Sequence, residues 1–178
     1  MVTKKVWDPL IRVFHWTLVG GFVLNALIID EDSKLHEQIG WVIVALLSAR
    51  LVWGLIGSRH ARFSDFLPSI SGAIGQLRDM ATGRVRHHLG HSPLGAWMIW
   101  NLLVGIAAIS LTGWMMTTAT FWGVDWVEEL HEVLVVWVGL SAGVHVVAVI
   151  VESRRTGVNL PRAMVTGSKV MPDDAFDG

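Results

Sequence analysis

A long apolar run close to the C-terminal end limits most strongly how this chain can fold. From Val133 to Val151 the run holds about 19 residues and no charged side chain. As a helix, about 20 such residues cross the hydrocarbon core of a bilayer. Three further apolar runs have similar length. We therefore predict an all-α membrane domain over 1–178, a four-helix bundle with spans at about 10–29, 35–56, 94–116 and 131–151.

The composition supports a membrane protein and narrows its chemistry. Of 178 residues, 52% are hydrophobic and only 16% are charged, which is little charge for a soluble domain. The chain contains no cysteine, which excludes disulfides, iron–sulfur ligation and the covalent attachment of a c-type haem. The first apolar run is too long for a signal peptide and lacks a small-residue cleavage site, so it is expected to be retained as a helix.

Lysine and arginine are divided unequally between the two sides that four spans create. With both termini on one side, that side receives 13 of the 14 Lys and Arg residues, and the other side receives Lys34 alone. The positive-inside rule then places the termini, the 57–93 loop and the 156–178 tail in the cytoplasm. Within the loop, 69–82 has apolar residues at helical spacing and is a candidate for an amphipathic helix at the membrane interface, with an irregular basic loop as the alternative.

Two histidines of the last span lie on nearly the same face of the predicted helix. His131 and His145 are 14 residues apart, so steps of about 100° bring their side chains to within about 40° of each other. The helical rise separates them by about 21 Å. A single buried histidine is usually explained by a hydrogen bond to a neighbouring helix. Two in axial register, in a segment where polar groups are costly, indicate ligand binding instead.

Two other histidines match this pair in depth. His15 lies about five residues from the inner end of the first helix, and His145 lies about six residues from the inner end of the fourth. His36 and His131 are both expected in the first turn of a helix that begins at the outer side. We therefore predict two opposed pairs, His15 with His145 toward the cytoplasm and His36 with His131 toward the outside.

Opposed imidazoles inside an apolar helical bundle are suited to hold haem. Each pair offers two neutral nitrogen donors to opposite faces of a flat, apolar macrocycle, so we predict two non-covalent b-type haems with these four histidines as axial ligands of the irons. A structural zinc site is a weaker alternative because it needs four ligands together. Glycines in the spans could leave room for the macrocycle or allow close helix packing. They are Gly20, Gly21, Gly40, Gly105, Gly113, Gly139 and Gly143.

Two arginines are candidates for binding the haem propionates. Arg12 lies one turn before His15 on the same face, and Arg50 lies 14 residues after His36, near the inner haem. Guanidinium–carboxylate pairing suits a partly buried site. For Arg12 the alternative is contact with lipid headgroups. Arg50 lies deeper in its span, which favours a specific partner. A trio in the basic loop is expected to be solvated or near lipid phosphate rather than to bind a metal: His87, His88 and His91.

Four segments of the chain resemble a known family. They are VWDPLIRVFHW at 6–16, GSRHARF at 57–63, LGHSPLG at 89–95 and ELHE at 129–132. Together they resemble the bacterial cytochrome b561 proteins and the b-type cytochrome subunit of membrane nickel–iron hydrogenases. The resemblance covers nearly the whole chain and implies a four-helix cytochrome of the bacterial inner membrane with two b haems. The family's haem ligands fall on His15, His36, His131 and His145.

The resemblance implies a protein that carries electrons between a membrane quinone pool, of ubiquinone or menaquinone, and a redox partner at the outer face. One alternative is an enzyme that reacts a small oxidant or reductant directly at the outer haem, such as a superoxide:quinone oxidoreductase. Another is the cytochrome b subunit of a hydrogenase, although the short outer connections favour a stand-alone protein. No nucleic-acid partner is expected, and a homodimer is left open.

The predicted outer connections are strongly acidic, with one lysine among eight acids. Complementary charge steers the encounter of redox partners and raises association rates. We therefore predict that a basic periplasmic carrier, such as a c-type cytochrome, docks on this face. The alternative is that the acids only solvate the connections and enforce the topology. The acids are Asp30, Glu31, Asp32, Glu37, Asp125, Glu128, Glu129 and Glu132.

Overall fold

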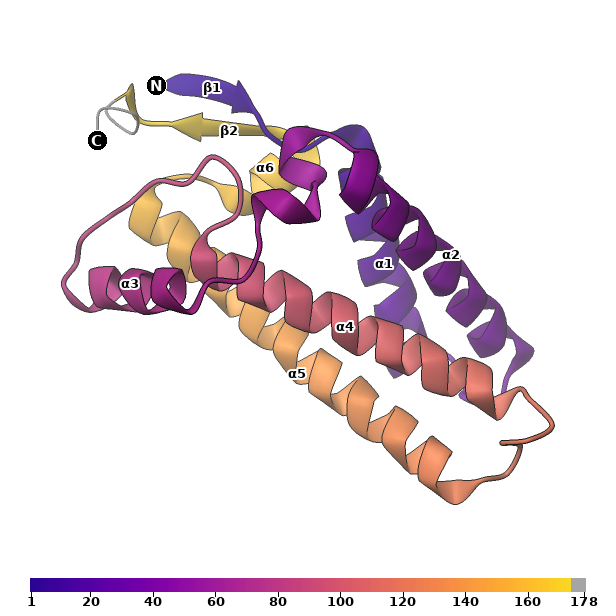
Figure 1. Ribbon diagram of the computed structural model, residues 1–178. Coiled ribbons are helices and arrows are strands. Elements are labelled where there is room, and N and C mark those ends of the chain that lie inside the picture. Colours follow the sequence, from indigo (N-terminus) through magenta and orange to yellow (C-terminus); the bar gives the residue numbers. More distant parts are fainter. Residues whose placement is uncertain (174–178) are drawn as a thin grey trace.

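Four long helices dominate the structure, a computed structural model that describes residues 1–173 (Figure 1). Each is long and apolar enough to cross a membrane. The predicted all-α membrane bundle is therefore confirmed, and three of the four helices begin and end within two residues of the expected spans. The four are α1 (Pro9–Leu27), α2 (Lys34–Ile56), α4 (Pro93–Met116) and α5 (Asp125–Thr156).

Polar caps fix where three of these helices begin. The side chain of Asp8 accepts a hydrogen bond from the Ile11 amide, and Pro9 occupies the first helical position of α1. Ser33 caps α2 by accepting from the His36 amide, and Ser92 caps α4 in the same way. Such caps satisfy amides that have no partner inside the helix, and each stabilises its helix by about 1 kcal/mol.

The α5 helix begins earlier than the sequence indicated. Its first residue is Asp125, so His131 lies at the end of the second turn and not in the first. The first turn contains Asp125 and Glu128, whose charges interact favourably with the amino-terminal end of the helix dipole. Apolar residues mark the part of a helix that lies in lipid, and a polar turn outside the lipid is therefore missed by an argument from hydropathy. The helix ends at Gly157, which adopts a left-handed conformation with φ of 69°.

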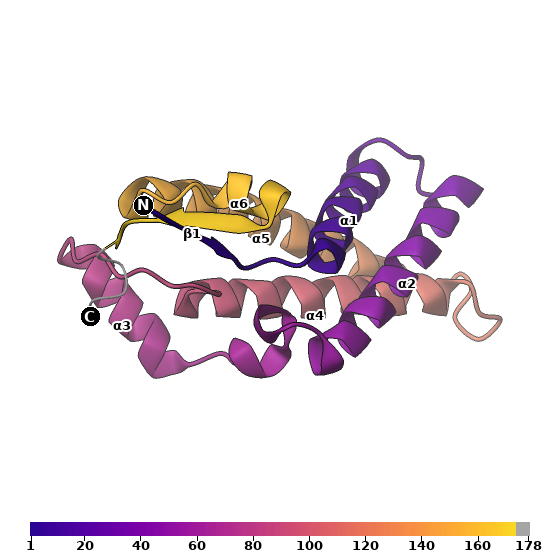
Figure 2. The ribbon, with the colours of Figure 1, turned by 90° about the horizontal axis from the view of Figure 1, so that it is seen from above.

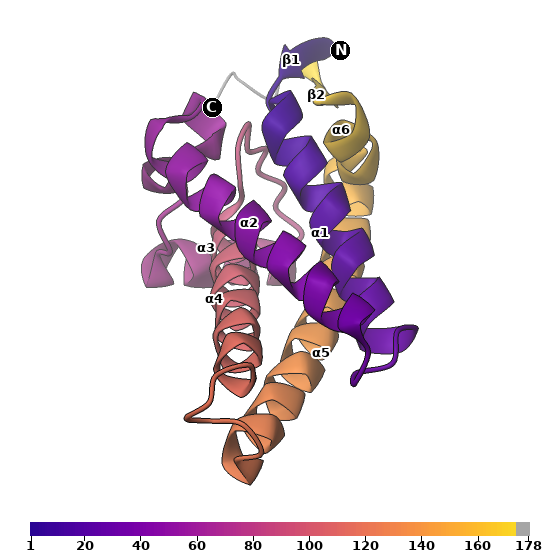
Figure 3. The same ribbon diagram turned by 90° about the vertical axis from the view of Figure 1, so that its right-hand side faces the viewer.

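The long helices pack closely in three pairs within residues 1–173: α4 on α5, α1 on α2, and α2 on α4. Helix α5 is not closely packed on α1 or α2 in this part of the chain. The connections α1–α2 and α4–α5 lie at one end of the bundle, and the N-terminus and the segment that follows α5 lie at the other end (Figures 1 and 3). The buried core where the helices meet consists of Phe14, Leu18, Ile43, Leu47, Ile106 and Val138.

A polar contact joins α4 to α5 in the middle of their spans. Asn101 donates to the hydroxyl of Ser141 at 2.9 Å and accepts from the indole of Trp137 at 3.1 Å. One turn further along α4, Gly105 allows the close approach, because a Cβ there would lie 2.6 Å from Val138 Cγ2. Small residues and interhelical hydrogen bonds of this kind hold helices together where lipid offers no hydrophobic driving force.

The tail expected at 156–178 is folded as far as the structure describes it. After α5 come a short helix, α6 (Leu160–Thr166), and a strand, β2 (Ser168–Met171). The strand pairs antiparallel with β1 (Val2–Lys5), with Val2 opposite Met171, so the two ends of the chain form one small sheet (Figure 2). The final residues, 174–178, lie outside the described part. A pairing between residues so distant in sequence leaves no signal in local patterns.

The loop between α2 and α4 contains the predicted amphipathic helix. It is α3 (Ile70–Ala81), capped by Ser69, and two short 3-10 turns precede it, η1 (Arg59–Ala61) and η2 (Phe63–Asp65). The face toward the protein is polar, because Gln76 accepts from the Leu94 amide and Asp79 pairs with Arg86 at 2.9 Å. The apolar side chains Ile70 and Leu77 point outward and are 69% and 53% exposed.

We predict that replacing Asn101 by Leu weakens the bundle. The change removes both interhelical hydrogen bonds, and comparable bonds in membrane proteins contribute about 0.6–2 kcal/mol each. The free energy of unfolding of the purified protein, measured by titration with SDS in detergent, should fall by about 1–2 kcal/mol. Ser48→Ala is the matched control, since this exposed serine bonds only to the Val44 carbonyl of its own helix. Equal stability of N101L and the wild type would contradict the assignment.

Candidate haem site

His36 and His131 face each other near the end of the bundle that holds the two short connections. Their ring centroids are 6.4 Å apart and their planes are inclined by 58°. Two imidazoles that bind one metal ion from opposite sides each place a nitrogen about 2 Å from it, which puts the ring centroids about 6 Å apart. The observed separation is therefore suited to one metal between the rings. His36 is held in place at its backbone, where its amide bonds to Ser33 and its carbonyl accepts from Asn25 at 3.0 Å.

His15 and His145 lie close to each other, on α1 and α5, toward the opposite end of the bundle. The two rings are near enough to interact electrostatically. The imidazole of His15 also contacts the edge of the Trp16 indole, with ring centroids 4.9 Å apart. All four candidate ligands are only half-buried by protein atoms. The structure thus brings His36 and His131 into ring contact and places His15 and His145 within electrostatic range of each other, at two levels along α5.

Two of these histidines have polar atoms that the protein leaves without a partner. Among the residues that the structure describes, the Nδ1 atoms of His15 and His36 are buried and make no hydrogen bond. A buried polar atom without a partner costs about 1–3 kcal/mol, so such atoms in a native site call for an explanation. These imidazoles have ring nitrogens without a hydrogen-bond partner, and they are half-open to the space between the helices. Together with the separation of His36 and His131, these features fit a haem-binding function.

The glycines of the spans divide between the two functions considered for them. Gly105 lies against Val138, and Gly21 lies against Ile43, so both allow helices to pack. Gly113 instead lies against a candidate ligand, because a Cβ there would be 3.3 Å from Cε1 of His131. A third group of glycines borders open space. A Cβ added at any of them would have no atom from outside its own helix backbone within 4 Å among the described residues: Gly20, Gly40, Gly139 and Gly143.

Arg50 is buried and forms no ion pair within the described part of the chain, and the Asp8 carboxylate interacts with it only at longer range. Its side chain is 5% exposed, and its guanidinium carbon lies 4.6 Å from the centroid of the Phe63 ring and 5.9 Å from that of Phe66. Its Nη1 atom is buried and makes no hydrogen bond. A buried cation needs compensation, and a carboxylate of a bound cofactor would supply it. The arrangement fits the propionate of a haem.

Arg12 has a protein partner. It donates from Nη1 to the carbonyl of Val165 at 2.7 Å and so ties α1 to the end of α6, while its Nε atom is buried and unpaired. Trp16 makes a similar contact with the Met164 carbonyl. The Arg12 side chain can offer only its remaining donors to a propionate.

His91 differs from the solvated residue that the sequence suggested. Its ring packs between those of Trp7 and Phe66, with centroids at 4.6 and 4.4 Å. Burial lowers the pKa of His91 to about 3, and the nearby charges of Lys169 and Arg50 act in the same direction, so its imidazole is neutral at physiological pH. Lys169 is also buried. It donates to the carbonyls of His88 and Gly90, and burial lowers its pKa to about 8.

Two other histidines of the loop have separate partners. His60 contacts Asp65 at 2.8 Å, and His87 lies 3.1 Å from the carbonyl of Thr156. Within residues 1–173, no three His, Cys, Asp or Glu side chains are grouped so that they could hold a metal ion. The metal-binding potential of the described chain therefore lies in pairs of histidines, which suits a metal that arrives inside a macrocycle.

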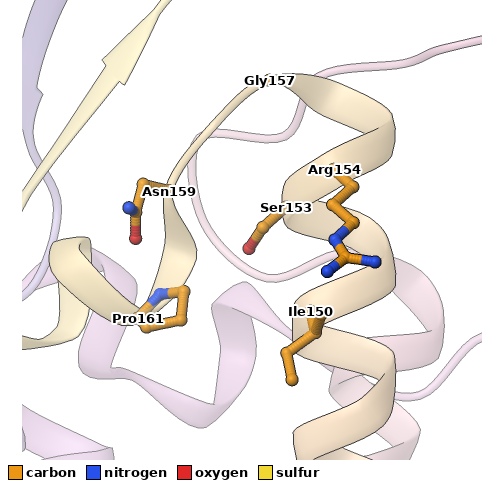
Figure 4. A pocket seen from close by; sticks show the side chains of 6 residues that line it. All are labelled: Ile150, Ser153, Arg154, Gly157, Asn159 and Pro161. Carbon is orange, nitrogen blue, oxygen red and sulfur yellow. The ribbon is translucent and has the colours of Figure 1, made fainter.

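Two cavities of about 340 Å³ lie away from these histidines. One is an open hollow between the end of α5 and α6 (Figure 4). Its lining residues are Ile150, Ser153, Arg154, Gly157, Asn159 and Pro161. The other lies between α1 and α2 and is lined mainly by apolar side chains. Neither includes a candidate ligand.

The end of the bundle above His36 and His131 is acidic. All eight acids of the outer connections and the adjoining helix turns are exposed, and none forms an ion pair within the described residues. The opposite end carries the arginines of the α2–α4 loop and of the α5 terminus. The bundle is therefore polarised along its length.

A comparison with known proteins gives the family. The sequence profile described as prokaryotic cytochrome b561 matches residues 6–167, which is most of the chain. No significant match was found among curated proteins or among solved structures. The family consists of membrane cytochromes that carry b-type haem and transfer electrons, in agreement with the four spans and the paired histidines. The chain belongs to the prokaryotic cytochrome b561 family.

Proposed function

We propose that this protein is a di-haem cytochrome that passes electrons across the bacterial inner membrane, between a quinone pool and a periplasmic redox partner. The observation that carries the proposal is the pair His36 and His131, whose rings face each other at 6.4 Å on helices that are not closely packed together. When bound, haem supplies one-electron chemistry at its iron. The protein supplies the ligands, their spacing and the local charge.

In this proposal, α5 contributes one ligand to each haem. His145 and His15 hold the inner haem, and His131 and His36 hold the outer one. The rise of about 1.5 Å per residue separates the two levels on α5 by about 21 Å, which is most of the thickness of the hydrocarbon core. Haems held at these two levels would supply one redox centre toward each side of the apolar layer. Arg50, and to a lesser extent Arg12, bind propionates of the inner haem.

The charge distribution supports one orientation. The end that contains the termini and the α2–α4 loop is rich in arginine, and short basic segments remain in the cytoplasm. Both termini are then cytoplasmic, and α3 rests with Ile70 and Leu77 at the inner membrane interface. The acidic end faces the periplasm, where its unpaired carboxylates attract a basic carrier such as a c-type cytochrome.

We predict that single histidine substitutions separate the two haems. His131→Ala should remove mainly the outer haem, and His145→Ala mainly the inner haem, because each deletes a ligand of one level. The haem absorbance of the purified protein should fall by about half in each variant, with helicity by circular dichroism unchanged. A wild-type ratio of one haem per chain would refute the two-haem proposal.

We predict that Arg50→Leu lowers the midpoint potential of the inner haem. The guanidinium is a positive charge beside the iron, and its removal favours the oxidised haem, which carries the greater positive charge. The potential of the outer haem, about 20 Å away, should change little. Arg154→Leu is the control, since this exposed arginine belongs to the same end of the bundle and makes no ion pair within the described residues. An unchanged inner potential in R50L would show that Arg50 serves packing alone.

We predict that electron transfer to a basic carrier slows as ionic strength rises. Salt screens the attraction between the acidic face and the carrier over a Debye length of about 10 Å at 0.1 M. The triple variant Asp125→Asn, Glu128→Gln and Glu129→Gln should weaken this dependence, as measured by stopped-flow oxidation of the reduced protein with horse cytochrome c as the probe. Asp173→Asn, at the opposite end, should leave it unchanged. Rates that respond neither to salt nor to the triple variant would place docking elsewhere.

A further inference from the structure

A buried threonine on α4 contacts the outer histidine pair from behind. Thr112 is 4% exposed, and its Oγ1 atom lies 2.9 Å from Nδ1 of His131. The same oxygen lies 3.1 Å from the carbonyl oxygen of Ala108 and 3.0 Å from that of Ile109, both in the preceding turn of α4. The hydroxyl thus links the backbone of one helix to the imidazole of another.

These three contacts determine where the protons lie. A hydroxyl has one proton to donate, and carbonyl oxygens can only accept. The Thr112 proton is therefore directed at the two carbonyls. If it were directed at His131 instead, the threonine oxygen would face both carbonyl oxygens at 3.0 and 3.1 Å with no proton between them. The contact with His131 is then a bond in which Nδ1–H donates and Thr112 Oγ1 accepts.

This bond selects one tautomer of the imidazole. With the proton on Nδ1, the other ring nitrogen, Nε2, carries a lone pair and can bind a metal. The neighbouring Gly113 leaves the ring room to adopt this position. A Cβ there would lie only 3.3 Å from Cε1 of His131, which is closer than ordinary van der Waals contact. By contrast, the Nδ1 atoms of His15 and His36 have no hydrogen-bond partner within the described residues.

We propose that Thr112 is a positioning residue for the outer haem, which holds His131 as the Nδ1–H tautomer and presents its Nε2 to the iron. The inference rests on the proposed function, in which His131 is an axial ligand. A hydrogen bond from the far nitrogen of a metal-bound histidine fixes the orientation of the ring and makes it a stronger electron donor. A stronger donor stabilises the ferric state, so Thr112 lowers the potential of the outer haem and strengthens its binding.

The asymmetry has a direct consequence within the outer site. His131 is tied from behind to α4, whereas the ring of His36 has no such support and is fixed only through its backbone. If both rings hold one haem, His131 would be the more firmly oriented ligand and His36 the freer one.

The test compares Thr112→Val, which keeps the shape and removes the hydroxyl, with Thr112→Ser, which keeps the hydroxyl. In T112V the midpoint potential of the outer haem should rise and that of the inner haem should stay constant. The low-spin ferric EPR signal of the outer haem should change. Haem transfer from the outer site to apomyoglobin should become about 10- to 100-fold faster. T112S should match the wild type in each measurement, because a hydrogen-bond acceptor remains.

Two controls separate the hydrogen bond from a general disturbance. Thr117→Val removes a hydroxyl that bonds only to the Trp114 carbonyl at the end of the same helix, and it should leave all three readouts unchanged. Thr112→Ala replaces T112V if the valine variant does not fold, and it should give the same shifts. The outer haem is identified beforehand as the one lost in His131→Ala.

Failure of this inference can be distinguished from failure of the proposed function. If H131A retains both haems, His131 is not a ligand, and the proposed function fails together with the role of Thr112. If H131A loses one haem but T112V and T112A keep the wild-type potential, EPR signal and transfer rate, the proposed function stands and the role of Thr112 is overturned. A shift of equal size in T112S would also overturn it, because the hydroxyl would then not be the cause.

Discussion

A polar ring inside a bilayer must be given a partner, and much of this structure follows from that requirement. Water is absent from the hydrocarbon layer, so an imidazole there is satisfied by protein or by a bound group. The chain has four such rings in its spans: His36 and His131 face each other, and His15 and His145 lie within electrostatic range, in each case on helices that are not closely packed together. Where a side chain of the spans has no cofactor to serve, the protein satisfies it internally, as with Asn101 between Ser141 and Trp137.

The helix α5 organises both levels of the proposed redox pathway. It contributes His131 and His145 from one face, and it is held firmly by α4 along its length. The facing ligands, His15 and His36, come from the α1–α2 pair, which contacts the rest of the bundle mainly through α4. In the proposed two-haem arrangement, the closely packed α4–α5 pair would supply one ligand for each haem, together with Thr112. The α1–α2 pair closes the sites from the other side.

Much of this arrangement could be predicted from the sequence because the lipid layer imposes simple rules. Hydropathy located the four spans, and helical geometry with antiparallel order was enough to match the depths of His36 with His131 and of His15 with His145. The contribution of Thr112 could not be predicted, since a threonine four residues from a helix end has no local pattern that indicates a contact with another helix. The start of α5 at Asp125 was missed because its first turns are polar. The burial of His91 depends on Trp7 and Phe66, which are distant in sequence and meet it only in the folded chain.

The small sheet that joins the two ends of the chain has a consequence for biogenesis. Strand β1 leaves the ribosome before the four membrane helices, yet its partner β2 begins at Ser168, after all four have been made. At a synthesis rate of about 5–20 residues per second, β1 waits roughly 10–30 s for that partner. During this time the amino terminus of α1 is not fastened to the rest of the protein, and the first helix can still settle in the membrane. The sheet closes only after all four membrane helices have been made, so a chain that stops before Ser168 lacks the contact that joins β1 to the segment after α5.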